Sequence, residues 1–403
     1  MARILISFVG TGALTGKGDS MREYRKTLYR IGDKELGEFP FVAAALTTEH
    51  KVDKVILIGT AHSMWEEVYR YFSEKNKREI CDKVYIEVSD YCSAADSQSP
   101  LELPHKREIE SAVGDAQIVI IRYGLDEGEI SENVGNIIKL NEQFNVGDEI
   151  IVDITHAFRS LPMLIMNLLI YMKNVSRKNI IISHIYYGML EMFNERKYAP
   201  IVDIKGVLDL NDWITGAYSF SQYGNAYKVA DILEGVETSL ASRLRQFSDN
   251  LNLNHLFALE QEVNNLAALR KAEYQSPLSE MVVKPIVDEF LRDFGVVGKN
   301  HALFQFRIAQ WQYKHRNYAS SLISLQESIL TYICQKEELD WRNKEDRDEA
   351  KKRVNSYPDL HCYFEINRLR NSVAHNLKTE KNAQTIIVRL GAALKKVGKV
   401  IKS

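Results

Sequence analysis

Cysteine is scarce in this sequence, with four thiols in 403 residues. None of them forms a C-x-x-C pair, and no histidine lies beside them at zinc-ligand spacing. A disulfide framework and a structural metal site are therefore not expected. Isolated thiols in strands and helices usually belong to the hydrophobic core, and we expect that role for Cys81, Cys92, Cys334 and Cys362.

Long apolar runs are also missing, because no stretch of about 18 apolar residues occurs that would predict a membrane span. The chain opens on a short apolar run, Ile4 to Val9, that is followed by Gly10-Thr11-Gly12. A run this short before glycines is typical of a buried first strand and not of a signal peptide. We therefore expect a cytoplasmic protein without a membrane partner.

A strong excess of one charge is absent overall, since the net charge is −2. The distribution is uneven, however. Residues 301–403 hold 19 Lys and Arg against 11 Asp and Glu, whereas residues 1–300 hold 33 against 43. The basic C-terminal part is typical either of a region that meets an anionic partner or of an ordinary solvated helical surface.

The first 210 residues alternate short Ile- and Val-rich runs with helical stretches. Such runs, buried on both faces, are typical of a mostly parallel sheet covered by helices. Helices are expected over 63–75 and 161–173, and a hairpin near 187–199. The predicted strands are 4–9, 55–58, 84–88, 118–121, 150–154 and 180–187.

From about residue 215 the strand-like runs end, and apolar residues recur at helical spacing. Ser276-Pro277 and the segment 295–298 break this pattern, and the charged stretch 337–353 reads as a loop or an exposed helical insertion. The fold class is therefore α/β followed by all-α. We expect three parts: an α/β domain over 1–210, a helical connecting region over 211–300 and a helical domain over 301–403.

Three loops follow predicted strands of the first domain. In an open parallel sheet, ligands bind beyond the C-terminal ends of the strands. Glycine lets backbone N–H groups approach a phosphate, Thr and Ser add donors, and Arg pairs with phosphate. The candidate anion-binding residues in these loops are Gly10, Thr11, Gly12, Gly59, Thr60, Ser63, Thr155, His156 and Arg159.

Two common phosphate motifs do not fit these loops. The third glycine of the dinucleotide pattern G-x-G-x-x-G is missing after Gly10, and a P-loop is absent around Gly12 to Lys17. Glycine after a strand is also a common turn residue, Asp153 or Thr155 is a possible helix cap, and His156 suits an ordinary hydrogen-bonded loop.

A polar edge is expected on a helix near the C-terminus. Ile366, Leu369 and Val373 share one face, while Asn371 and His375, four residues apart, share another beside Arg370. Metal-free RNA cleavage needs proton transfer, which His provides near neutral pH, and a cation to stabilise developing negative charge, which Arg provides. An exposed helix without a catalytic role is the simpler alternative.

These residues together resemble the CARF–HEPN ribonucleases of type III CRISPR systems, CARF being a CRISPR-associated Rossmann-like domain. The resemblance covers the whole chain. It rests on segments 7–12, 57–65 and 153–160, which are similar to strand-end motifs of one subgroup. It rests also on Arg370-Asn371-x-x-x-His375, which matches the short HEPN pattern.

The resemblance implies a function that spacing does not reveal. A dimeric CARF domain would bind cyclic oligoadenylate as an activator, with cyclic tetra-adenylate favoured and cyclic hexa-adenylate as the alternative ring. Binding would activate a HEPN dimer, or a higher even oligomer, to cut single-stranded RNA without a metal or another cofactor. Arg370, Asn371 and His375 would be the catalytic residues, and one His in each helix calls for two copies to complete the site.

Three other functions stay open at this point. A CARF-type regulator or ring nuclease would bind the same ligand without RNase activity in its helical domain. A metal-dependent nuclease is disfavoured, because no convincing carboxylate–carboxylate–lysine cluster is present in the sequence. A nucleotide-dependent oxidoreductase is disfavoured by the missing third glycine.

Overall fold

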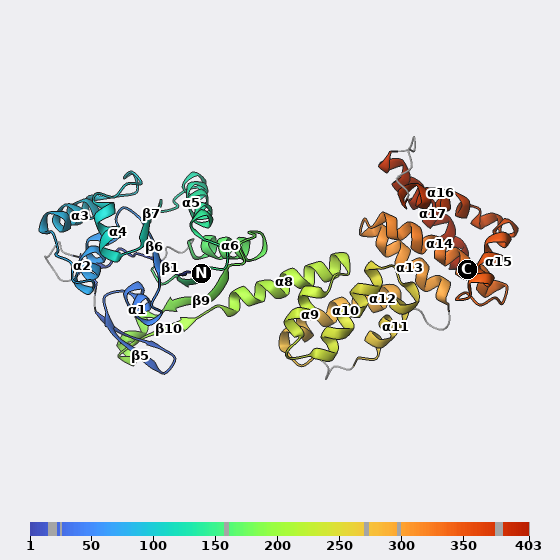
Figure 1. Cartoon of the computed structure of the whole chain (residues 1–403), viewed down its shortest axis with the longest axis horizontal. Helices are drawn as coiled ribbons and strands as arrows, with labels where there is room; N and C mark the ends of the chain where they lie inside the picture. The colour runs from blue at the N-terminus through green and yellow to red at the C-terminus, as the bar shows by residue number, and fades with distance from the viewer. Residues whose placement is uncertain are drawn as a thin grey trace. The chain divides into compact units, whose positions relative to one another are not determined.

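The computed structural model describes residues 1–14, 22–24, 26–156, 161–269, 274–295, 300–374 and 382–402. The chain divides into two compact units, Met1–Leu210 and Asn211–Ser403, which Figure 1 shows in blue to green and in green to red. Each unit is described by itself below.

The first unit is built on an eight-stranded sheet in the order β5-β4-β10-β9-β8-β1-β6-β7. The run from β9 to β7 is parallel throughout, β10 is antiparallel to β9, and β4 and β5 form an antiparallel hairpin. A short ladder of β2 and β3 stands apart. The strands are β1 Arg3–Phe8, β2 Ala13–Leu14, β3 Arg22–Glu23, β4 Thr27–Ile31, β5 Lys34–Phe39, β6 Lys54–Gly59, β7 Ala116–Ile120, β8 Glu149–Asp153, β9 Ile181–Gly188 and β10 Ala199–Asp203.

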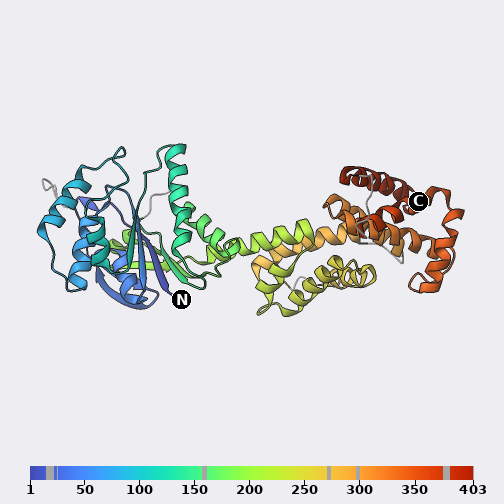
Figure 2. The same cartoon turned by 45° about the horizontal axis from the view of Figure 1, so that its top comes forward.

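Helices cover both faces of this sheet, as Figures 1 and 2 show. Alternate residues of the central strands point to opposite faces: Leu5 joins one core with α1 to α4, whereas Ile4 and Ile6 join another with α5 and α6. The mostly parallel α/β fold predicted from the Ile- and Val-rich runs is thereby confirmed. The helices are α1 Val42–Glu49, α2 Trp65–Lys75, α3 Asp82–Ala94, α4 Lys106–Val113, α5 Glu127–Lys139 (extended by a 3₁₀ turn, Leu140–Gln143), α6 Leu161–Asn174 and α7 Phe193–Arg196 (preceded by a 3₁₀ turn, Leu190–Met192).

One local prediction needs correction. The segment 84–88 was expected as a strand but lies inside α3, because Val84, Val88 and Cys92 recur every four residues and are the buried face of a helix. The hairpin predicted near 187–199 is confirmed, since the consecutive strands β9 and β10 pair antiparallel. They are joined by a 3₁₀ turn and α7.

The core role predicted for the thiols holds for two of the four. Cys92 and Cys334 are buried, Cys362 is partly buried, and Cys81 is exposed. Cys81 is the residue just before α3, so its side chain lies outside the buried face of that helix.

The second unit is entirely helical in its described residues, as expected from the spacing of its apolar residues. The helix break predicted near Gly295 is confirmed, because α12 ends at Phe294 and Asn300 caps α13 by accepting a hydrogen bond from the Leu303 N–H. The helices are α8 Gly206–Tyr223, α9 Tyr227–Leu233, α10 Thr238–Asn252, α11 Leu256–Ala267, α12 Lys284–Phe294 (preceded by a π-helical turn, Ser279–Val283), α13 His301–Lys314, α14 Tyr318–Lys336, α15 Lys344–Arg353, α16 Cys362–Ala374 and α17 Ala383–Ile401, with 3₁₀ turns Val354–Ser356 and Pro358–Leu360 before α16.

Helix α13 belongs to two hydrophobic cores of this unit. Phe304 and Ile308 pack with the helices of residues 213–294, whereas Phe306 and Ala309 pack with α14, α16 and α17. The regions 211–300 and 301–403, predicted as separate parts, therefore share a buried helix, and their division into functional domains stays a prediction. None of the described helices has the length and apolarity to cross a membrane.

A pair of neighbouring histidines, His50 after α1 and His184 on β9, predicts pH-dependent stability of the first unit. The His50 ring lies 5.3 Å from the His184 ring and 5.5 Å from the Tyr186 ring, measured between centroids. Burial, and then the proximity of His184, lower the pKa of His50 below its usual value. The unfolded state therefore binds the proton more readily, so stability falls as the pH drops below about 6.5.

The measurement is the melting temperature between pH 7.5 and 5. It should fall on acidification in the wild type and fall less in His50→Gln. His105→Gln provides a matched contrast of opposite sign, because the Glu87 carboxylate, at 2.6 Å, raises the pKa of His105 and stabilises its charged form at acidic pH. This second variant should steepen the acid loss, and identical profiles for all three proteins would contradict the assignment.

Candidate functional sites

The three predicted loops of the first unit lie together at the C-terminal ends of three neighbouring strands. They follow β8, β1 and β6, which are neighbours in the sheet. In the sheet, β6 and β7 lie on one side of β1, whereas β8 and β9, which come later in the sequence, lie on its other side. The strand order therefore reverses between β1 and β8. Ligands of open α/β sheets bind in the crevice outside the strands at such a point.

Hydrogen bonds join the first two of these loops. The Met64 N–H donates to the Gly10 carbonyl at 3.0 Å, and the Ser63 hydroxyl donates to the Val9 carbonyl at 2.7 Å. The Ser63 hydroxyl also accepts from the Thr60 N–H at 3.0 Å. Thr60 and Ser63 are fully buried, so the structure shows them shaping the loop, and a direct contact with a ligand stays a prediction.

Two of the predicted glycines stand where a side chain would collide. A Cβ atom at Gly12 would lie 2.0 Å from the Met64 sulfur, and the Gly12 backbone has φ +69°, in the left-handed region. A Cβ atom at Gly59 would lie 2.7 Å from both the Ser63 hydroxyl and the Trp65 ring. Glycine at position 12 therefore allows the loop after β1 to approach Met64 of the loop after β6, whereas Gly59 allows the loop after β6 to fold back on its own start.

The third loop contains a buried carboxylate. Asp153, at the end of β8, accepts hydrogen bonds from the Ser7 hydroxyl at 2.5 Å and from both the hydroxyl and the N–H of Thr155 at 2.5 and 2.9 Å. The Thr155 hydroxyl also accepts from the Gly188 N–H at 2.8 Å. The Thr155 side chain thus ties the loop to β9, and Asp153 ties it to β1.

His156 extends this third loop toward Gly10. Its ring lies 5.8 Å from the Tyr24 ring, and the Tyr24 hydroxyl donates to the Gly10 carbonyl at 2.8 Å. The buried Nε2 atom of His156 has no hydrogen-bond partner in the described part of the chain. Burial lowers the pKa of His156 and raises the pKa of Asp153. Arg159, the next predicted residue, lies outside the described residues.

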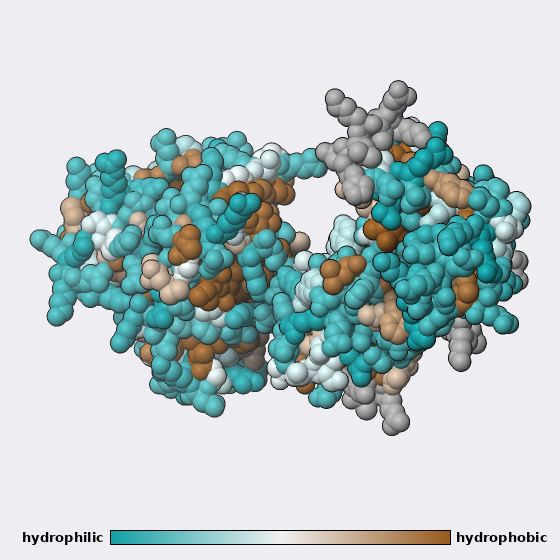
Figure 3. All heavy atoms as spheres, turned by 45° about the vertical axis from the view of Figure 1, so that its right-hand side comes forward, coloured by the Kyte–Doolittle hydropathy of each residue, from teal (hydrophilic) through white to brown (hydrophobic). Residues whose placement is uncertain are grey.

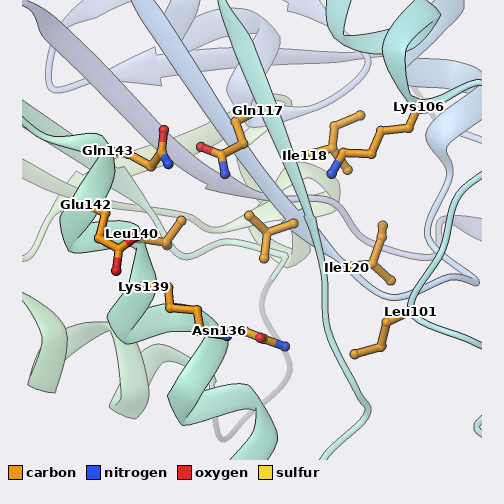
Figure 4. Close-up of a pocket in the computed structure, with 11 residues that line it drawn as sticks. Leu101, Lys106, Gln117, Ile118, Ile120, Asn136, Lys139, Leu140, Glu142 and Gln143 are labelled. Atoms are coloured by element: carbon orange, nitrogen blue, oxygen red, sulfur yellow. The ribbon is translucent and has the colours of Figure 1, made fainter.

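A cavity of about 420 Å³ also lies in the first unit, but none of the predicted residues lines it. It lies beside the edge strand β7, and its lining includes Gln117 of β7, Lys106 of α4, and Asn136 and Lys139 of α5 (Figure 4). The Glu110 carboxylate accepts from the Ile118 N–H of this edge strand. The cavity is therefore separate from the three strand-end loops.

In the second unit, Arg370 is held on α16 by a hydrogen-bond network. Its Nε donates to the Gln326 side-chain oxygen of α14 at 3.3 Å. The Gln326 amide nitrogen in turn donates to the Tyr363 hydroxyl and to the Asn367 side-chain oxygen, both at 3.3 Å. Gln326 is buried and Arg370 is half-buried, so the guanidinium is anchored at one nitrogen.

The predicted stripe and polar edge of this helix are partly revised. Ile366 and Leu369 are buried as expected, but Val373 is 44% exposed, because the buried face ends before the last turn of α16. Asn371 is half-buried on the helix, next to Arg370. His375 lies outside the described residues. Within the described parts of the chain, no group of three or more His, Cys, Asp or Glu could hold a metal ion.

Comparison with known proteins places the first unit in a family. The family model described as the CARF domain of the CRISPR system endoribonuclease Csx1 matches residues 4–191. Residues 4–191 make up most of the first unit, so this unit is similar to a CARF domain along nearly its whole length. A second family model, described as the second domain of CRISPR-associated protein MJ1674, matches residues 209–300.

Two further comparisons cover most of this chain. The chain is 32% identical over 400 residues to CRISPR-associated protein MJ1674 of Methanocaldococcus jannaschii. The aligned region is 93% of this chain and 62% of the relative. The chain therefore spans less than two thirds of that relative. A solved structure of Enterococcus italicus Csm6, bound to cyclic hexa-2'-fluoro-hexa-dAMP, covers 100% of this chain and 94% of its own, with 13% identity and a TM-score of 0.40.

Sequence reasoning missed several residues that support the candidate sites. Ser7 and Tyr24 support the strand-end loops of the first unit, and Gln326 supports Arg370. Ser7 had a signal, since it is a polar residue inside an otherwise apolar strand. Gln326 also had one, because it is a polar residue on the buried side of the predicted helix that contains it.

Proposed function

We propose that this protein is a cyclic-oligoadenylate-activated, metal-independent endoribonuclease of type III CRISPR antiviral defence. The observation that carries the proposal is the meeting of the Gly10, Gly59 and Asp153 loops at the strand-order reversal of a CARF domain. The helical edge with Arg370 supplies the chemistry that such an activator would switch on.

Cyclic oligoadenylate would bind beside the β1 and β8 loops. Backbone groups at Gly10 and Gly12 and the partly exposed Thr11 would face the ring phosphates. The unpartnered Nε2 of His156 suits a hydrogen bond to the ligand, since an unpaired buried polar atom is costly without one. Arg159 would contribute a charge-assisted contact to a phosphate. Cyclic tetra-adenylate is the proposed ring.

RNA cleavage would take place on α16. One His375 would accept the proton of the attacking 2′-OH, while the partner's His375 would protonate the leaving 5′-oxygen. Arg370 would stabilise the charge that develops on the phosphate, so the reaction requires no metal. Asn371 would position the reacting groups. Products would then end in a 2′,3′-cyclic phosphate, and DNA, which lacks the 2′-OH, would not be cut.

A homodimer is the proposed minimum assembly, because a two-fold symmetric ring matches a two-fold symmetric pocket. Figure 3 shows hydrophobic surface gathered on the first unit. Met163 and Tyr171, two turns apart on α6, are 69% and 38% exposed, and α6 begins just after the Asp153 loop. A second copy that covers α6 would bring its own Asp153 loop to the same site.

This assignment predicts that Met163→Glu/Tyr171→Glu shifts the protein toward monomer and weakens activator binding, because charged side chains disfavour an apolar interface. Light scattering and calorimetry measure the two effects. Ile86→Glu on α3, a 55% exposed apolar residue of the opposite helical layer, serves as the matched control. A dimer that withstands the double variant would contradict the use of α6.

Gln326 is a positioning residue in this proposal. Gln326→Leu should lower kcat by about 10- to 100-fold with KM little changed, because a displaced Arg370 stabilises the transition state less well. Gln326→Glu keeps an acceptor for the Arg370 Nε and should restore much of the rate, whereas a purely structural role predicts no such rescue. Equal rates in the wild type and in Gln326→Leu would remove Gln326 from the site.

The direct test is an RNase assay with purified protein, fluorescent single-stranded RNA and cyclic tri-, tetra- or hexa-adenylate, with and without EDTA. Stimulation by cyclic tetra-adenylate that EDTA does not affect is expected. Activator binding without RNA cleavage would favour the regulator or ring-nuclease alternative. Cleavage abolished by EDTA would indicate a metal-dependent nuclease.

A further inference from the structure

A second cavity, of about 750 Å³, lies in the helical unit away from the Arg370 edge. It is formed where the 3₁₀ turn Pro358–Leu360 leads into α16 and where α17 nears its end. The three strand-end loops are in the other unit and play no part in it. Its lining is Tyr332, Ser356, Tyr357, Pro358, Asp359, Leu360, His361, Cys362, Lys396, Lys399 and Val400.

The half-buried rings of Tyr332 and Tyr357 form part of the cavity wall. The Tyr357 hydroxyl donates to the Glu337 carboxylate at 2.5 Å, and Arg353 pairs with the same carboxylate. Burial and this carboxylate raise the pKa of Tyr357 to about 12, so its hydroxyl stays a donor at neutral pH. The Tyr357 ring is therefore held in place. Fixed aromatic rings are the surfaces on which nucleobases stack.

Two lysines of α17 line the same cavity as these rings. Lys396 and Lys399, three residues apart, share one face of the helix and are exposed. Neither forms an ion pair with a described residue, whereas the exposed Lys351 and Lys352 of α15 pair with Asp348 and Glu349 on their own helix. Asp359 also lines the cavity and offsets one of the two lysine charges. The cavity lining therefore keeps a net positive charge.

We propose that this cavity is an accessory site for single-stranded RNA, with a base against the tyrosine rings and backbone phosphates at Lys396 and Lys399. An acidic peptide would satisfy the lysines but would leave the rings without a partner. Residues 362 and 370 of α16 are eight positions apart, or about 12 Å along the helix axis. An RNA strand held here would therefore extend toward Arg370. The inference rests on the proposed function for its choice of RNA.

The test measures RNA binding without cleavage. His375→Ala protein is titrated into fluorescein-labelled, unstructured pyrimidine RNA of 20 or 4 nucleotides, and anisotropy is followed over a range of salt concentrations. Lys396→Glu/Lys399→Glu should weaken binding of the 20-mer by about tenfold or more and reduce the slope of log K against log salt by about 1.4. The 4-mer should bind weakly and respond much less.

Matched variants separate the site from general electrostatics. Lys351→Glu/Lys352→Glu makes the same change of charge on the same unit and should leave the affinity for the 20-mer within about twofold. Tyr332→Phe should bind like wild type, whereas Tyr332→Leu should bind about 5- to 10-fold more weakly, because stacking needs the ring. Melting curves check that each variant is folded.

Three outcomes would overturn the site: equal losses in the two lysine pairs, no loss in Lys396→Glu/Lys399→Glu, or competition by polyglutamate as effective as by unlabelled RNA. The proposed function fails separately. If activated wild-type protein does not cut RNA but binding still depends on Lys396, Lys399 and Tyr332, the accessory site stands and the nuclease assignment falls.

Discussion

Replacing His375 with Ala is expected to lower the rate of RNA cleavage by about 10²–10⁴-fold, because the site would lose its proposed proton-transfer group. Arg370→Ala should have an effect of about 10²–10³-fold, through lost stabilisation of the phosphate charge. The measurement is single-turnover cleavage with saturating cyclic tetra-adenylate, together with analysis of the product ends. Cyclic-oligoadenylate binding by calorimetry should be unchanged in both variants, because the residues lie in the helical unit.

Arg368 supplies a control for this pair. It is an exposed arginine two residues before Arg370, and Arg368→Ala should keep most of the activity. RNA with 2′-O-methyl groups at every position should resist cleavage by the wild-type protein. Full activity of Arg370→Ala/His375→Ala, or cleavage of the methylated RNA, would exclude the mechanism.

Gly12→Ala is expected to weaken cyclic-oligoadenylate binding by at least about tenfold and to abolish activation at limiting ligand. The added Cβ atom would overlap the sulfur of Met64, which is fully buried, so the Gly10–Gly12 backbone must move away from its position beside His156. The loss of two hydrogen bonds between backbone N–H groups of this loop and the ligand phosphates, at about 1 kcal/mol each, is enough for that change in affinity. Calorimetry with cyclic tetra-adenylate measures it.

Gly32→Ala is a control that separates the effect of the Cβ–Met64 collision from the effect of backbone strain. Gly32 also has a left-handed backbone, with φ +55°, but a Cβ atom there would meet no atom within 4 Å. Both variants therefore carry a conformational cost of about 1–2 kcal/mol in stability, while Gly12→Ala alone displaces the loop. Wild-type ligand binding by Gly12→Ala, or an equal loss in both variants, would remove the loop from the ligand site.

The sequence predicts the sheet of the first unit well because its strands are buried on both faces. Continuous Ile and Val runs such as 55–58 leave little alternative to a central strand. The same reasoning fails at 84–88, where hydrophobic residues two and four apart satisfy both a strand and a helix, and tertiary packing decides for α3. The β4–β5 hairpin was missed because its strands are short, half-buried and polar on one face.

The candidate sites were less predictable than the fold. Pattern reasoning located the loops, because glycines follow the strands, but it could not distinguish side chains that face a ligand from those that face the protein. Thr60 and Ser63 turn inward to bond their own loop, whereas the Nε2 of His156 is buried without a partner. Gln326 acts across 44 residues of sequence, a distance at which periodicity carries no information about contacts.

Because α13 is buried in both hydrophobic cores of the helical unit, it also limits where this protein can be divided to build chimeras. A chimera that joins a foreign C-terminal effector after residue 300 would remove Phe304, Ile308 and Trp311 from the core of the region before it, and would leave that region with an unfilled apolar face. A graft at 210/211 leaves both cores of the helical unit whole, but it cuts α8, whose Leu208 belongs to a core of the first unit, so the foreign domain has to supply the start of this helix. Exchange of domains between proteins of this kind should therefore transfer 211–403 as one module, with 1–210 as the other.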